Sequence, residues 1–251
     1  MPFDKEYPIR LPFSSFEFCL DIIVLNLSKG IKMARIEIRG FDNLGFSQIT
    51  FEGPELEPIK SEIRKIESNF EIAQKHNQFL AGNIRREYLL KDSKKYISDL
   101  LYPFLLEYNE FHKNWVVDTA RSIGRKSGNP QKKIILEEVW VNFQKKYQFN
   151  PPHSHDGILS FVIWIQIPFL MKDELAKSPG AESNTNIPGC FNFHFMNSLG
   201  ELRNSAIHAD KSMENTLLIF PAKMVHSVSP FFTSDEYRIS VAGNFVVGLT
   251  S

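Results

Sequence analysis

The stretch Phe149-Asn150-Pro151-Pro152-His153-Ser154-His155-Asp156-Gly157 is the most informative part of the sequence. Two prolines restrict the backbone immediately before two histidines that are separated by one residue. Alternate side chains of an extended segment share a face, so His153 and His155 are expected to point one way and Asp156 the other. Imidazoles are common ligands of transition metals. The stretch therefore predicts a β-strand that presents a metal-binding pair.

A third histidine, His226, ends the segment Phe220-Pro221-Ala222-Lys223-Met224-Val225-His226. Arg238 and Ser240 follow in the run Tyr237-Arg238-Ile239-Ser240, on one face of a second predicted strand. Read as a hairpin, residues 224–229 and 237–247 would place His226 opposite Arg238 or Ser240. Apolar neighbours predict that Arg238 is buried, where its fork of donors suits a carboxylate. The two segments predict a metal site beside an anion clamp.

The alternation of apolar residues predicts a mainly β fold behind a helical region. Helices are predicted over 55–75 and 93–124, with a kink or break at Pro103. Residues 34–38 and 46–51 suggest a hairpin, 126–133 a linker, and 169–189 a long loop. The predicted core strands are 134–144, 158–168, 190–196, 216–221, 224–229 and 237–247.

Composition excludes several classes of protein. The 251 residues contain 29 basic and 29 acidic side chains, so no net charge favours nucleic acid or an anionic membrane. No apolar run is long enough to span a membrane, and no signal peptide is evident. Two cysteines, Cys19 and Cys190, form no disulfide framework and favour a reduced, cytoplasmic setting, which is the host cytoplasm if the chain is viral.

Several of these motifs resemble the Fe(II)/2-oxoglutarate-dependent dioxygenase superfamily, and more narrowly the 2-oxoglutarate oxygenases that marine bacteriophages encode. The resemblance covers roughly residues 134–247, with a weaker match at Leu80-Ala81-Gly82-Asn83-Ile84. It rests on Trp140-Val141-Asn142-Phe143-Gln144, Phe149-Asn150-Pro151-Pro152-His153-Ser154-His155, Leu159-Ser160-Phe161-Val162-Ile163-Trp164 and Arg238-Ile239-Ser240.

The resemblance implies a double-stranded β-helix core, a jelly-roll or cupin-like fold, preceded by α-helices. We expect this core over residues 131–251 and a hairpin and helical region over 33–130. Residues 1–32 are either an extension before a start at Met33 or an arm packed on the domain.

The superfamily usually has His-x-Asp or His-x-Glu where this chain has His153-Ser154-His155. We therefore expect His153, His155 and His226 to bind Fe(II). Two other ligand sets stay open at this point. One is His153, Asp156 and His226, if a bulge turns Asp156 inward. The other is His155 and His226 alone, with Gly157 in the place of the acid.

The cosubstrate would be 2-oxoglutarate, with Arg238 and Ser240 holding its distal carboxylate. Related oxygenases place a tyrosine that contacts the cosubstrate at about the position of Gln144, and Asn142 shares its strand face. Both are candidate cosubstrate contacts.

The implied reaction consumes O2, decarboxylates 2-oxoglutarate to succinate and hydroxylates an unknown substrate, either a small molecule or a protein side chain. Two rival functions remain. One is a cupin-type three-histidine metalloprotein that does not use 2-oxoglutarate. The other is a non-catalytic jelly-roll structural module.

Overall fold

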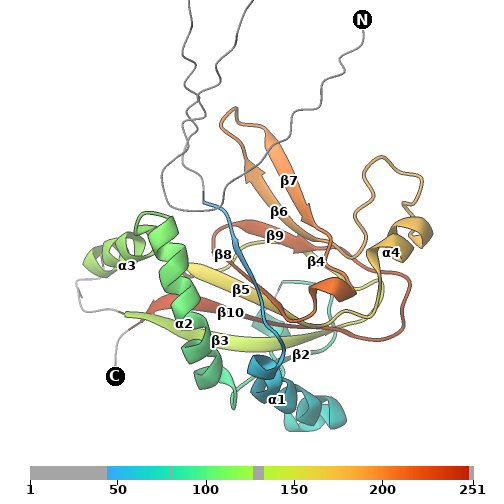
Figure 1. Ribbon diagram of the computed structural model, residues 1–251, viewed down its shortest axis with the longest axis horizontal. Helices are drawn as coiled ribbons and strands as arrows, with labels where there is room; N and C mark the ends of the chain where they lie inside the picture. The colour runs from blue at the N-terminus through green and yellow to red at the C-terminus, as the bar shows by residue number, and fades with distance from the viewer. Residues whose placement is uncertain (1–43, 80, 127–132, 249–251) are drawn as a thin grey trace, which may run out of the picture. The chain divides into compact units, whose positions relative to one another are not determined.

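The described residues form two antiparallel sheets (Figure 1). The computed structural model describes residues 44–79, 81–126 and 133–248. The larger sheet contains, in spatial order, β1 (Ser47–Thr50), β8 (Thr216–Pro221), β5 (Leu159–Gln166), β10 (Arg238–Gly248), β3 (Lys133–Gln144) and β2 (Glu87–Leu89). The smaller sheet contains β4 (Asn150–His153), β9 (Val225–Val228), β6 (Phe191–Met196) and β7 (Leu202–Ile207).

Helices cover one face of the larger sheet (Figure 1). They are α1 (Glu57–Ser68), α2 (Lys94–Phe111) and α3 (Trp115–Lys126), and a fourth helix, α4 (Met171–Lys177), precedes β6. Short 3-10 turns span Pro54–Leu56, Phe70–Ile72, Asn77–Phe79 and Lys211–Met213. The apolar face of α1, with Ile59 and Ile63, packs in one core with Val141 and Phe143 of β3.

The strands of the larger sheet are covered on both faces because a second core forms on the side away from the helices. In β5, Phe161 and Ile163 belong to the helix-side core, whereas Val162 and Trp164 belong to the second core with Phe191 of β6. This explains why β5 is a continuous apolar run. The predicted fold class is confirmed: the core is a double-stranded β-helix with a helical buttress.

The predicted hairpin of 224–229 with 237–247 is wrong. Strand β9 pairs with β4 and β6, while β10 pairs with β3 and β5 in the other sheet. The segment between them crosses from one sheet to the other, so His226 and Arg238 reach the pocket from different sheets.

The helical region also differs from the prediction. Helix α2 continues through Pro103, which lies on its exposed side, and ends at Phe111. The break falls at Lys113 and Asn114, whose φ angles of 52° and 66° are left-handed and cannot continue an α-helix. The predicted loop over 169–189 contains α4.

Two strands, β2 and β7, were not predicted. Residues 1–43, Cys19 among them, and 127–132 of the predicted linker lie outside the described residues, so only the β1 part of the predicted 34–51 hairpin is described.

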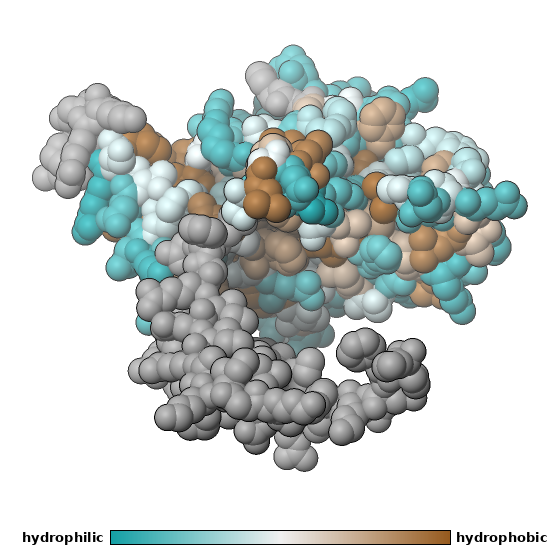
Figure 2. All heavy atoms as spheres, turned by 90° about the horizontal axis from the view of Figure 1, so that it is seen from above, coloured by the Kyte–Doolittle hydropathy of each residue, from teal (hydrophilic) through white to brown (hydrophobic). Residues whose placement is uncertain are grey.

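The visible face of the described residues has no single dominant hydropathy. Figure 2 shows hydrophilic and hydrophobic residues intermixed over the face it presents, as is normal for a folded protein. None of the helices in the described ranges has the length and apolar character that a bilayer-spanning segment requires.

Candidate metal centre and cosubstrate pocket

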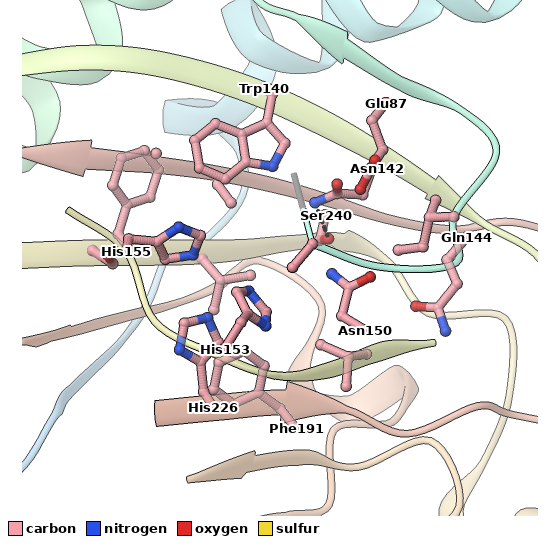
Figure 3. Close-up of a pocket in the computed structure, with 18 of the residues that line it drawn as sticks. Glu87, Trp140, Asn142, Gln144, Asn150, His153, His155, Phe191, His226 and Ser240 are labelled. Carbon is pink, nitrogen blue, oxygen red and sulfur yellow. Dashed lines mark hydrogen bonds between the residues drawn. The ribbon is translucent and has the colours of Figure 1, made fainter. Parts of the chain in front are cut away.

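Three histidines converge at one end of a pocket between the sheets (Figure 3). His153 on β4 lies directly opposite His226 on β9 in the strand register, and His155 follows β4. One ligand nitrogen from each ring lies within 4.8 Å of the others. The ring centroids are 4.3 Å apart for His153 and His226, and 5.1 Å apart for His155 and His226. The alternation argument therefore held for His153 and His155.

Backbone carbonyls fix the orientation of two of these rings. Nδ1 of His153 lies 2.7 Å from the Pro151 carbonyl oxygen, and Nδ1 of His226 lies 3.0 Å from that of Met224. A neutral imidazole that donates from Nδ1 has its lone pair on Nε2, which is the arrangement found around metal-binding histidines. The two prolines hold the carbonyl that orients His153.

Burial keeps the imidazoles neutral. It lowers the pKa of His226 to about 3 and that of His155 to about 4, and it also lowers the pKa of His153. The proximity of the other histidines lowers the pKa of His155 and His226 further. A neutral imidazole is the form that binds a metal ion. The donor set therefore fits Fe(II) or a neighbouring divalent transition metal.

Asp156 does not join the cluster. Its side chain is fully exposed, and its Oδ1 lies 2.6 Å from Nζ of Lys223. That ion pair lowers the pKa of the Asp156 carboxyl. The chain then turns at Gly157, where φ is +120° and an added Cβ would lie 2.8 Å from the Phe245 carbonyl oxygen. The backbone thus leads into β5 without the bulge that would turn Asp156 inward.

Arg238 lies in the same pocket and is only 3% exposed. Its Nε and Nη2 donate to Oε1 of Gln144 at 3.0 and 2.6 Å, and its Nη1 donates to the Gly189 carbonyl oxygen at 2.6 Å. A guanidinium has five N–H donors, so three bonds leave two for a ligand. Burial lowers the pKa of Arg238 to about 10, which leaves it cationic at neutral pH.

No carboxylate of the described residues forms an ion pair with this guanidinium. Glu174, a buried acid whose charge raises the pKa of Arg238, is bound instead to the backbone N–H groups of Phe232 and Thr233. A buried cation without an anion is costly, so this site fits an anionic ligand.

Asn142 and Ser240 face each other on adjacent strands of the larger sheet. Asn142 Nδ2 donates to Ser240 Oγ at 3.3 Å, and both residues line the pocket. Gln144 occupies the next pocket-facing position of β3, opposite Arg238. Gln144 accepts hydrogen bonds from Arg238, and its contact with the cosubstrate stays a prediction.

The pocket also contains residues that sequence reasoning missed, namely Glu87, Trp140 and Asn150 (Figure 3). The Trp140 ring lies 5.8 Å from that of His155. Asn150 packs against Gly82, where an added Cβ would lie 2.1 Å from its Oδ1, but this approach is visible only in the structure. For Glu87 the sequence offers no local signal.

Residues 138–244 match the model of a protein family described as "Putative 2OG-Fe(II) oxygenase". No curated protein matches the chain. Among solved structures, a prolyl-4-hydroxylase from Pseudomonas putida is 14% identical with a TM-score of 0.47, covering 82% of this chain and 94% of that chain. The viral collagen prolyl hydroxylase vCPH from Paramecium bursaria Chlorella virus-1 is 13% identical with a TM-score of 0.43, covering 80% and 96%.

The matched segment contains the histidine cluster, Asn142, Gln144, Arg238 and Ser240. This match confirms the resemblance seen in the sequence: residues 138–244 are similar to the 2OG-Fe(II) oxygenases.

Proposed function

We propose that this chain is an Fe(II)- and 2-oxoglutarate-dependent hydroxylase in which His153, His155 and His226 bind the iron. Arg238, with Ser240 beside it, anchors the distal carboxylate of 2-oxoglutarate. The observation that supports this most strongly is the pairing, in one pocket, of three neutral imidazoles with a buried guanidinium that has no carboxylate partner among the described residues.

The protein's own contribution is binding, orientation and exclusion of water. The carbonyls of Pro151 and Met224 keep the Nε2 atoms of two histidines directed at the metal. Gln144 holds the Arg238 fork in position. Phe191 stacks on His226 with ring centroids 5.4 Å apart and closes one side of the site. When bound, Fe(II) and 2-oxoglutarate supply the activation of O2 for oxidation of a C–H bond. The substrate is a small molecule or a protein side chain.

The test is an anaerobic titration of the metal-free protein with Fe(II), with and without 2-oxoglutarate, followed by visible absorption. A weak charge-transfer band is expected only when both are present. Arg238→Ala should lose 2-oxoglutarate binding by roughly thirty- to several-thousand-fold while it keeps iron. Arg238→Lys should also be impaired, because a point charge cannot replace the planar fork.

Arg203→Ala is the matched control, because Arg203 lies on β7 with its side chain 56% exposed. The control should behave like the parent protein. If the parent binds iron but no 2-oxoglutarate, the all-histidine site belongs to a metalloprotein of a different activity. If it binds neither, the domain is a structural module.

A further inference from the structure

Glu87 is an acid inside the pocket that the proposed chemistry does not use. It lies on the edge strand β2, lines the pocket and is 3% exposed (Figure 3). Asn77 Nδ2 donates to Glu87 Oε2 at 3.0 Å and also to the Ile84 carbonyl oxygen at 2.8 Å. The other carboxylate oxygen, Oε1, has no hydrogen-bond partner among the described residues. Asn77 thus fixes the side chain and leaves one buried acceptor vacant.

A second vacant acceptor lies beside it. Glu87 is directly opposite Asn142 in the register of β2 and β3, and Asn142 is directly opposite Ser240 on β10. Residues paired in this way have side chains on the same face, about 5 Å apart. The amide nitrogen of Asn142 is bound to Ser240, whereas its Oδ1 is buried and has no partner among the described residues. Glu87, Asn142 and Ser240 therefore form one row across the sheet. The amide nitrogen of Asn142 faces Ser240, and the acceptors without partners are on Asn142 and Glu87.

The carboxyl group of Glu87 also has no ion-pair partner among the residues that the structure describes. The groups that pack around β2 are Lys75 and His76 on the preceding segment, Arg86 next to Glu87, and Glu138 on β3. Within the described ranges, no ion pair involves Glu87. Neither these groups nor Arg238 and the three histidines that share the pocket shift the pKa of Glu87. Burial raises the pKa of Glu87 to about 7, and the Asn77 bond lowers it in part.

Two buried ionisable groups of opposite kind, Arg238 and Glu87, thus line one pocket, and neither forms an ion pair with any of the described residues. In the proposed oxygenase, Arg238 receives the carboxylate of 2-oxoglutarate. We propose that Glu87 Oε1 and Asn142 Oδ1 bind a protonated amine of the primary substrate. An ammonium group offers three donors and no acceptor, which matches acceptors of this kind, and it supplies the missing positive charge. A hydroxyl group would supply one donor and no charge.

The assignment rests on the proposed function for the identity of the substrate, but the amine site can be tested without turnover. The probe is n-butylammonium, and its uncharged counterpart is 1-butanol. In the 251-residue chain, every glutamate is labelled with 13C at the side-chain carboxyl carbon. Each probe is titrated into this protein and followed by NMR, once with Zn(II) and 2-oxoglutarate present and once without them. The Glu87 signal is assigned with Glu87→Gln.

Binding of the ammonium is expected to shift the Glu87 signal and to lower the pH at which it titrates, because a cation stabilises the carboxylate. Glu87→Gln should weaken n-butylammonium binding by at least about tenfold above neutral pH. Glutamine retains an oxygen for Asn77, so the fold should persist. Glu107→Gln on the exposed side of α2 makes the same change of charge and should have no effect.

Three results overturn the inference. The first is equal affinity for 1-butanol and n-butylammonium, and the second is undiminished binding to Glu87→Gln. The third is no response of the Glu87 signal at up to about 100 mM ammonium, a concentration well above the millimolar range of weak binding. In that case Glu87 stays protonated, and its O–H donates a hydrogen bond to Asn142 Oδ1. If ammonium binds at Glu87 but neither metal nor 2-oxoglutarate binds, the proposed function fails and the amine site stands.

Discussion

Gln144 accepts two hydrogen bonds from the Arg238 guanidinium, one from Nε at 3.0 Å and one from Nη2 at 2.6 Å. The two residues are direct partners across β3 and β10, so the contact follows from the register of the sheet. Gln144 Nε2 donates in turn to the Gln148 carbonyl oxygen at 2.6 Å, which fixes which end of the amide faces the arginine. A neutral oxygen orients the guanidinium without neutralising it. The positive charge is thereby left for a ligand.

Gln144→Glu tests this distinction between orienting and neutralising. A carboxylate at this position would pair with Arg238 and compete with the distal carboxylate of 2-oxoglutarate. We expect 2-oxoglutarate affinity to fall by roughly ten- to a thousandfold, with Fe(II) affinity unchanged. Calorimetric titration of the Zn(II)-loaded protein with 2-oxoglutarate measures the first affinity, and anaerobic titration of the metal-free protein with Fe(II) measures the second. Gln48→Glu, on the exposed side of β1, is the control. Unchanged 2-oxoglutarate affinity in Gln144→Glu would place the anion site elsewhere.

His226→Ala is expected to abolish stoichiometric Fe(II) binding, with at least about a hundredfold loss of affinity. Removing a metal ligand should weaken metal binding more than removing a group that hydrogen-bonds to a ligand. The latter typically lowers metal affinity or activity by roughly 10–100-fold. The fold should survive because burial lowers the pKa of His226 and keeps its imidazole neutral, so the substitution leaves no opposite charge without its partner. His208→Ala, at an exposed position after β7, should leave binding intact. Full iron occupancy in a folded His226→Ala protein contradicts the assignment.

The extended alternation of Pro152 to Asp156 was enough to predict the orientation of His153 and His155, because side-chain direction in a strand is a local property. Burial of Arg238 was likewise predictable from its apolar neighbours. The partner of each strand was not. Strands β9 and β10 are consecutive in the chain, yet they pair in different sheets. Local pattern identifies a strand but carries little information about which sheet it joins.

Glu87 shows a second limit of sequence reasoning. Its strand, β2, has only three residues, too few for an alternating pattern to be recognised. Its burial depends on long-range contacts of β2 with β3 and of Asn77 with the Glu87 carboxyl. The break between α2 and α3 was missed for a related reason. It occurs at Lys113 and Asn114 in left-handed conformations, without the glycine or proline that usually marks such a point.

His155→Asp and Asp156→Ala separate the ligand sets that the sequence left open. If His155 binds the metal, His155→Asp should retain Fe(II) with the more common two-histidine, one-carboxylate set, whereas His155→Ala should lose much of it. Asp156→Ala should be nearly silent in metal binding, because its carboxylate lies in solvent beside Lys223. Equilibrium competition with a chelator gives the affinities. An empty site in Asp156→Ala together with a full one in His155→Ala would reverse the assignment.

The stability of the ligand-free protein should depend on the ionisation of Glu87. Its pKa rises from an ordinary 4.5 to about 7 on folding, chiefly because of burial. A raised pKa means that the folded state binds the proton more tightly, so this contribution to stability is full below about pH 4.5 and is lost as the pH rises through about 7. This rise in the pKa of Glu87 corresponds to about 3 kcal/mol of stability as an upper bound.

Glu87→Gln stays neutral at every pH. The free energy of unfolding of Glu87→Gln should therefore equal that of the parent at about pH 5. At about pH 8.5 it should exceed that of the parent by about 1–3 kcal/mol. Urea unfolding at both pH values measures this, with Glu107→Gln as the control. A constant difference between Glu87→Gln and the parent at the two pH values would show that Glu87 ionises normally in the folded chain.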